Sequence, residues 1–142
     1  MLKNTGNSPA INVQLHPDIV DIMGSRSKKQ SYVDQMLEIC KRAETTPDDN
    51  ALEGNTIFPG DTFTYDKWPL AKKTSEIEYD VFAPEIIGCV SYRFSYERGR
   101  HVTQFIVDLR KYLGQRGFMM SDVFVRESDL VLIPSFIGGN AD

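Results

Sequence analysis

Few residues in this chain have the chemistry of a nucleophile or its activating base. Cys89 follows Gly88 in an apolar stretch, and only His16 and His101 could activate it. A Cys-His couple would generate a thiolate, so a small cysteine-dependent enzyme that uses Cys89 and His101 is one hypothesis. The competing interpretation is a thiol that packs as a small apolar side chain inside a strand.

No other catalytic or metal-binding pattern occurs. No serine lies in a Gly-x-Ser-x-Gly elbow, and neither Cys-x-x-Cys nor His-x-x-x-His spacing is present. The glycines do not form a phosphate-binding loop between a strand and a helix. We therefore predict no enzyme activity, no catalytic residue, no metal site and no cofactor.

Arginines gather around one predicted hairpin. Arg93, Arg98 and Arg100 alternate there with aromatic residues, and Arg110 follows them. Such a surface could bind an anionic ligand, either RNA or lipid headgroups. The net charge of −4 argues against a dedicated nucleic-acid binder. We keep Arg93, Arg98 and Arg100 as a candidate interaction surface and expect no nucleic-acid partner.

The two cysteines suggest a separate hypothesis. Cys40 lies on the apolar face of a predicted helix and Cys89 on a central strand, so the thiols could meet if the helix packs on the sheet. A disulfide that closes a loop of roughly fifty residues would stabilise the fold by about 4 kcal/mol. It would form only in an oxidising compartment; elsewhere both would remain buried free thiols.

The elements that must position these residues are mostly strands. Apolar and polar residues alternate over 10–15, 86–95 and 101–109, and the last two ranges form a hairpin whose loop places Gly99 at a predicted positive φ. Further strands are predicted at residues 62–65, after a Pro59–Gly60 turn, and at 123–125 and 130–133. The glycine-rich tail, residues 138–142, is predicted to be flexible.

One helix is predicted, over residues 31–44, with Ser31 at its N-terminal cap. Its apolar face is formed by residues at helical spacing: Val33, Met36, Leu37, Cys40 and Ala43. Residues 16–30 are polar and contain Pro17, which predicts a loop with His16 as a solvated side chain.

Length and composition limit the fold class. The 142 residues are 41% hydrophobic and 25% charged, which is typical of one soluble globular domain. Short strands follow one another without alternating helices, so the pattern predicts a mostly β, antiparallel β-sandwich over residues 1–142 with one inserted helix.

Four short motifs carry a resemblance. The chain resembles a set of uncharacterised bacterial proteins that have N-terminal transmembrane helices and a C-terminal immunoglobulin-like domain. The shared motifs are Asn-x-Gly-x-x-Pro-Ala at residues 4–10, Phe-Pro-Gly at 58–60, Gly-Cys-x-x-Tyr at 88–92 and His-x-Thr-x-Phe at 101–105. The glycine-rich Ala-Asp ending is also similar.

The resemblance implies an immunoglobulin-like sandwich that serves as a noncatalytic accessory or interaction domain of a membrane-linked protein. It carries over no catalytic residues, because the family has no assigned activity. The longest apolar stretches are much shorter than a transmembrane helix, so the chain as written is expected to be soluble, with membrane contact only through an upstream segment.

The N-terminus generates one further expectation. Residues 1–3 are too short to pair fully with a strand at residues 10–15. We expect a missing first strand, an open edge along residues 10–15, and self-association through that edge, in addition to an unknown protein partner.

Overall fold

The structure is a computed structural model, and it describes residues 1–21, 29–45, 54–64, 81–111, 115–116, 118–119 and 127–139. This part of the chain is mostly β with one α-helix, as the sequence predicts. The elements, in chain order, are β1 (Leu2–Lys3), β2 (Ala10–Asp21), α1 (Lys29–Thr45), β3 (Asn55–Ile57), β4 (Thr62–Phe63), β5 (Val81–Phe82), β6 (Pro84–Phe94), β7 (His101–Lys111), β8 (Gln115–Arg116), β9 (Phe118–Met119), a short 3₁₀ turn (Glu127–Asp129) and β10 (Leu130–Gly139).

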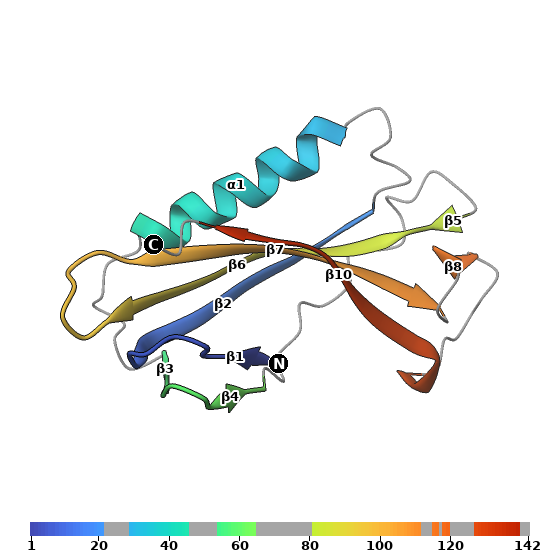
Figure 1. The fold of residues 1–142 in the computed structure, drawn as a ribbon. Coiled ribbons are helices and arrows are strands. Elements are labelled where there is room, and N and C mark those ends of the chain that lie inside the picture. Colours follow the sequence, from blue (N-terminus) through green and yellow to red (C-terminus); the bar gives the residue numbers. More distant parts are fainter. Residues whose placement is uncertain are drawn as a thin grey trace.

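The strands form one large antiparallel sheet and two small ones. The large sheet has the order β10-β7-β6-β2-β3, and β8 pairs with β7 beside it. The two-stranded sheets are β1-β4 and β5-β9, both antiparallel. Helix α1 lies across one face of the large sheet, and β1 with β4 lies at the other face (Figure 1). Strand β6 is therefore central both within the sheet and between the layers.

Each face of the large sheet has its own hydrophobic core. On the helix face, Ile87 and Cys89 of β6 pack against Met36, Cys40 and Ala43 of α1. On the opposite face, the strand residues Ala10, Val13, Ile57 and Val90 pack together, with Leu2 of β1 and Phe63 of β4 against them. Because side chains alternate along a strand, the odd-numbered side chains of β6 face the helix and the even-numbered ones face the other core.

The predicted hairpin arms are confirmed. Strands β6 and β7 pair from Glu85↔Asp108 to Tyr92↔His101, which keeps the predicted faces opposed. The loop differs from the prediction, because the chain reverses in a turn closed by the Glu97 amide donating to the Phe94 carbonyl, 3.1 Å away. Among the described glycines, positive φ occurs at Gly60 and Gly88 and not at Gly99.

Helix α1 begins two residues before the predicted range and ends one residue after it. Ser31 is therefore inside the first turn and does not cap the helix. Met36, Cys40 and Ala43 are buried as predicted, whereas Leu37 is 46% exposed. Tyr32 and Ile39 pack on the sheet as well, because the contact face is centred on positions 36, 40 and 43.

The predicted loop over residues 16–30 is wrong at its start. Strand β2 continues through Pro17 to Asp21, paired with β6 from His16↔Cys89 to Asp21↔Pro84. Proline is compatible with this position, because the strand lacks a partner on its other side here among the described residues. Asp18 then accepts a hydrogen bond from Gln35 of α1, which connects strand and helix.

Strand β2 contains a β-bulge that the alternation did not reveal. Ile11 pairs with Arg93 and Gln14 with Ser91, so Asn12 and Val13 together oppose a single residue of β6. Asn12 accommodates the bulge at a φ of 52°, a conformation that asparagine tolerates better than most residues. Gly54 crosses so closely that a Cβ there would lie 2.0 Å from Asn12 Oδ1.

The expectation of an open edge along residues 10–15 is wrong at Ala10 and Val13. Strand β3 pairs there, with the registers Ala10↔Ile57 and Val13↔Asn55. Strand β1 pairs instead with β4, its neighbour in the small sheet. The paired residues are 47 and 42 positions apart in the sequence, so local spacing could not identify this partner strand.

Asn4 joins the first turn of the chain to the end of β3 and the turn that connects β3 to β4. Its Nδ2 donates to the carbonyl oxygens of Ser8 and Ile57, at 2.9 and 2.8 Å, and its Oδ1 accepts from the Gly6 amide. Its main chain bonds to Asp61 and Gly60 in the adjoining turn. We define Asn4 and these partners as the Asn4 clamp.

The turn that receives the clamp has the predicted Pro59–Gly60 chemistry. Gly60 has a φ of 86°, and the Asp61 amide donates to the Phe58 carbonyl at 3.0 Å. Proline followed by a positive-φ glycine is the pattern of a type II turn. The Asn-x-Gly-x-x-Pro-Ala segment and the Phe-Pro-Gly turn, two of the four shared motifs, are therefore joined by hydrogen bonds.

At the C-terminal side, β10 extends the strand predicted over residues 130–133. It runs to Gly139 with an irregularity between Pro134 and Phe136, so Gly138 and Gly139 are strand residues and not part of a flexible tail. Predictions for residues 22–28, Tyr65, 123–125 and 140–142 lie outside the described residues. No helix in the described part is long and apolar enough to cross a membrane.

Replacement of Ile87 by alanine should strongly destabilise the fold. The side chain is fully buried between β6 and α1, so the expected loss in unfolding free energy is about 3–5 kcal/mol. Leu37→Ala on the exposed side of α1 is the matched control and should change it by less than about 0.5 kcal/mol. Equal effects in urea unfolding would contradict the assignment of the helix faces.

Loss of the Asn4 side chain should destabilise the N-terminal turn. Asn4→Ala leaves the carbonyls of Ser8 and Ile57 without their amide donor, at an expected cost of about 1–3 kcal/mol. Asn4→Asp retains an acceptor for Gly6 but removes both donated bonds, so it should cost nearly as much. Asn7→Ala, at an exposed position of the same turn, should be neutral in the same melting experiment.

Candidate functional site

A polar network that the sequence did not single out lies on the helix face of the sheet. His16 sits opposite Cys89 in the β2-β6 register, and Ser91 is two residues along β6 on the same face. This diagonal arrangement brings His16 Nε2 to 3.0 Å from Ser91 Oγ. Arg100 reaches back from the loop, and its Nη1 donates to Ser91 Oγ at 3.0 Å.

The hydrogen bond from Arg100 has a fixed direction. Arg100 can only donate, so Ser91 Oγ accepts from it. The hydroxyl still has its own proton and a second lone pair, so the tautomer of His16 sets the direction of the His16–Ser91 bond. Burial lowers the pKa of His16, and the nearby Arg100 charge lowers it further. The imidazole is therefore mostly neutral at pH 7.

In the tautomer whose Nε2 carries no proton, Ser91 would donate to His16, which is the hydrogen bond of an activated serine nucleophile. Here, however, Ser91 has no exposed surface. A nucleophile must reach the carbonyl or phosphoryl atom that it attacks, and a fully buried hydroxyl does not. The network instead gives these buried polar side chains hydrogen-bond partners at the place where β2, β6 and the hairpin loop meet.

The hypothetical Cys89-His101 couple is not assembled. Cys89 faces α1, where it has no exposed surface. His101 pairs with Tyr92 on the opposite face and stacks on its ring. Burial raises the pKa of the Cys89 thiol strongly, and the neighbouring Cys40 raises it further. The thiolate needed for catalysis is therefore disfavoured.

The candidate arginines occupy different environments. Arg98 is exposed in the hairpin loop, whereas Arg93 and Arg100 are half-buried. Arg100 is directed inward to Ser91. Arg110 lies at the far end of β7, where it forms an ion pair with the buried Asp108. Of the four, Arg98 is the one exposed at the surface, and the common anionic-ligand surface stays a prediction.

Aromatic rings form a connected group at the hairpin end of the sheet. Phe94 and Tyr96 stack with centroids 5.8 Å apart and planes at 6°. The centroid of the His101 ring lies 5.1 Å from that of Phe94 and 5.6 Å from that of Tyr92. The Nε2 atom of His101 also contacts the Glu97 carboxylate. Tyr96 is 70% exposed, whereas the other three rings are half-buried, so the group presents mainly the Tyr96 ring to solvent.

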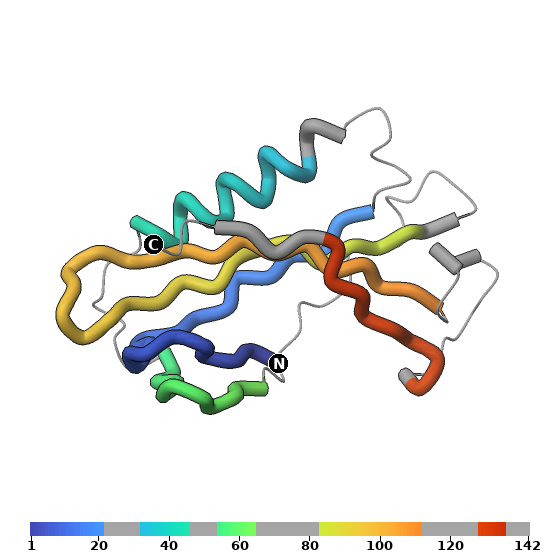
Figure 2. The backbone as a smooth tube through the Cα atoms, viewed as in Figure 1, coloured from blue at the N-terminus to red at the C-terminus, as the bar shows by residue number. Residues whose placement is uncertain are grey.

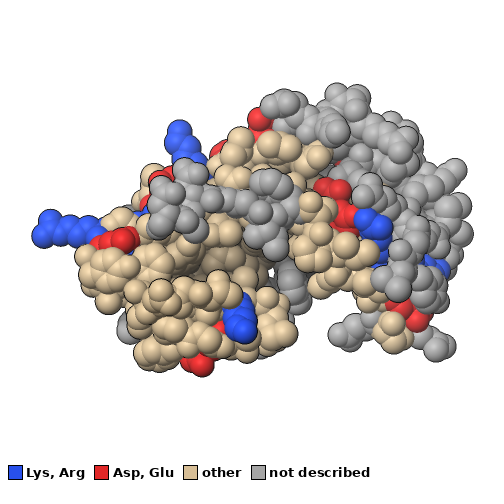
Figure 3. Space-filling view, in the orientation of Figure 1, with Lys and Arg blue, Asp and Glu red and all other residues tan. Residues whose placement is uncertain are grey.

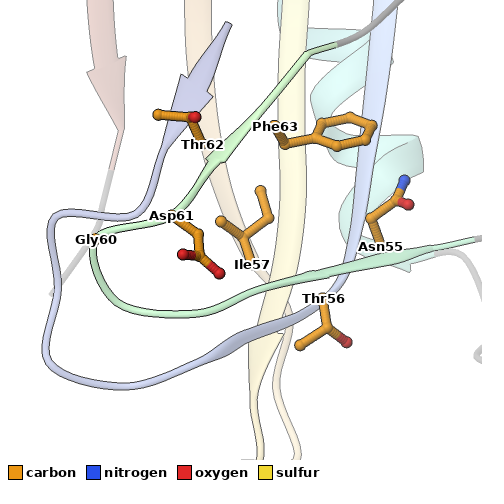
Figure 4. A pocket seen from close by; sticks show the side chains of 7 residues that line it. All are labelled: Asn55, Thr56, Ile57, Gly60, Asp61, Thr62 and Phe63. Atoms are coloured by element: carbon orange, nitrogen blue, oxygen red, sulfur yellow. The ribbon is translucent and has the colours of Figure 1, made fainter.

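A cavity of about 340 Å³ is lined by β3, β4 and the turn between them (Figure 4). Ile57 and Asp61 are among its lining residues, and both belong to the unit that the Asn4 clamp secures. The other lining residues are Asn55, Thr56, Gly60, Thr62 and Phe63. Asp61 is the only titratable lining residue, so the cavity lacks an acid-base pair.

The described residues contain no group of three or more metal-ligating side chains. His16 and Asp18, a His-x-Asp pair expected in a loop, lie in β2 instead, and each has a protein partner. Pro17 predicts a loop, which would leave His16 in solvent. An edge strand tolerates proline, so the strand pattern could have been continued through His16. That His16 and Ser91 share a face depends on the register of β2 and β6.

Acidification should destabilise the protein through His16. The folded state lowers the pKa of His16 below its ordinary value of 6.5, so below that pH the unfolded chain binds more protons than the folded one. The unfolding free energy should fall as the pH drops through this region. His16→Gln should flatten that slope.

The same titration can be followed by NMR. The His16 ring should titrate with a midpoint below 6.5, and Arg100→Gln should raise that midpoint by removing a nearby positive charge. A midpoint at or above 6.5 in the unsubstituted protein would contradict the buried neutral imidazole.

Comparison of the chain with known proteins gives no match. No family model matches the chain, and neither a curated protein nor a solved structure matches it. The resemblance to bacterial immunoglobulin-like domains therefore rests on the four motifs alone.

Proposed function

We propose that this chain is a noncatalytic interaction domain of a membrane-linked bacterial protein. Burial of the two groups best suited to nucleophilic attack, Ser91 and Cys89, favours this function over an enzyme. The membrane link is supported by the motif resemblance. The observation that carries the proposal is a pair of large aromatic side chains exposed on turns at one end of the sheet.

These aromatic residues share one end because of strand register. Ile57, Ala10 and Phe94 form a row across β3, β2 and β6. Phe58 directly follows Ile57, and Tyr96 comes two residues after Phe94, so both project from the turns beyond this row. They are 57% and 70% exposed. We call Phe58, Phe94 and Tyr96 the aromatic end.

The aromatic end has the composition of a protein-binding surface. Tyrosine, phenylalanine and arginine are enriched in such interfaces, and Arg98 is exposed in the same loop as Tyr96. The Tyr96 ring is held by stacking on Phe94, so it would lose little conformational entropy on binding. Charged side chains are sparse over β3 and β4 in Figure 3, which favours a protein over a polyanion as the partner.

An immunoglobulin-like sandwich is the architecture proposed for this domain. Its support is the small β1-β4 sheet against the face opposite the helix, with Leu2 and Phe63 in the shared core. The hairpin and turn loops gather at one end of the large sheet (Figure 2). Loops at the ends of β-sandwiches commonly bind partners, which fits the location of the aromatic end.

The proposal can be tested by site-specific photo-crosslinking in cells of the source organism. A benzophenone amino acid at position 58 or 96 should give a protein adduct, and the same probe at the exposed Lys41 on α1 should not. Excess purified domain should compete, whereas a Phe58→Ser/Tyr96→Ser variant should not. Equal adducts at all three positions, or none at 58 and 96, would reject the aromatic end as the binding surface.

For the partner so identified, Tyr96→Ala should weaken binding about thirtyfold, the effect of a hot-spot residue of roughly 2 kcal/mol. The same substitution should lower unfolding free energy by only about 0.5–1 kcal/mol, because the exposed side chain loses little more than its stacking on Phe94. Unchanged affinity would show that Tyr96 is not part of the interface.

A further inference from the structure

The two cysteines, 49 positions apart as Cys40 and Cys89, are brought together beneath α1. Both are buried, and both belong to the cluster that joins the helix to β6. The cluster also contains Ala43, three residues after Cys40 on the same helical face. Small side chains at both positions allow the C-terminal half of α1 to approach the sheet closely.

The two thiols lie on opposite sides of the helix-sheet interface. Cys40 faces the sheet from α1, and Cys89 faces the helix from β6, where it has no exposed surface. Burial raises the pKa of the Cys89 thiol, and the neighbouring Cys40 raises it further. This proximity within one buried cluster is the geometric basis for a bond between the two sulfur atoms.

We propose that Cys40 and Cys89 form an intramolecular disulfide that fastens α1 to β6 when the chain folds in an oxidising compartment. The oxidant is a low-molecular-weight disulfide such as oxidised glutathione. One cysteine thiolate attacks it, forming a mixed disulfide and releasing one glutathione thiolate. The second thiolate attacks the protein sulfur of the mixed disulfide, which forms the Cys40–Cys89 bond and releases the second glutathione.

In this exchange the two cysteines lose two electrons and two protons. The electrons reduce the glutathione disulfide, and the protons pass to solvent or to the released thiolates. The bridge joins the only helix of the described residues to the central strand of the sheet. Because it lies in the helix-side core and not at the aromatic end, it is independent of the proposed binding function.

Burial determines when the bridge forms. Desolvation raises the pKa of both thiols, so the folded, reduced protein contains little thiolate and reacts slowly with disulfides. During folding, before α1 docks, the thiols are accessible. Oxidation should therefore be fast in refolding chains and slow in the native reduced protein.

The chain can be refolded in a glutathione redox buffer and in a reducing buffer, then digested with trypsin without reduction. The oxidised sample should contain the peptides 30–41 and 74–93 joined by a disulfide, and the intact chain should weigh less by two hydrogen atoms. Two free thiols after oxidative refolding, glutathione adducts that do not resolve, or bridges between chains would each overturn the proposal.

A stability measurement separates a fitting bridge from a strained one. The oxidised protein should melt about 5–15 °C higher than the reduced protein. Cys40→Ala keeps a small apolar side chain in the core, and its melting temperature should not respond to reductant. Should that variant fail to fold, Cys89→Ala provides the same control. A melting temperature that is equal or lower on oxidation would overturn the proposed fastening.

Discussion

Burial of β6 between two layers is the constraint on which the rest of the structure depends. Ile87, Cys89 and Ser91 have no exposed surface, and the strand is hydrogen-bonded on both sides, to β2 and β7. The approach of β2 is so close that a Cβ on Gly88 would lie 2.1 Å from the His16 carbonyl oxygen. Helix α1 packs on one face of this strand, and residues of the β1-β4 sheet pack in the core on the other face.

This burial decides which residues can act on another molecule. Ser91 and Cys89 carry the groups that react most readily as nucleophiles, yet both point into the helix-side core. The side chains of His16 and Arg100 form hydrogen bonds with the buried Ser91 hydroxyl. Among the described residues, the large aromatic side chains of Phe58 and Tyr96 are exposed on turns at one end of the sheet, and this exposure supports the proposed recognition function.

Local sequence patterns predicted much of the fold. Alternation along residues 86–95 and 101–109 predicted both arms of the central hairpin and their faces, because side chains in a strand alternate wherever the strand is placed. Pro59 and Gly60 predicted their turn for a similarly local reason. Leu37 was misplaced because apolar spacing fits more than one helix face, and only the docked sheet selects among them.

The sequence by itself determined the strand alternation, the Pro-Gly turn, the single predicted helix and the absence of catalytic motifs, since each depends on residues near one another in the chain. Only the tertiary structure decided that β3 pairs with β2, that Asn12 forms a bulge and that His16 meets Ser91. The last two residues are 75 positions apart, and contacts over such separations depend on strand register. One added residue, the bulge at Asn12, shifts that register and changes which side chains face each other.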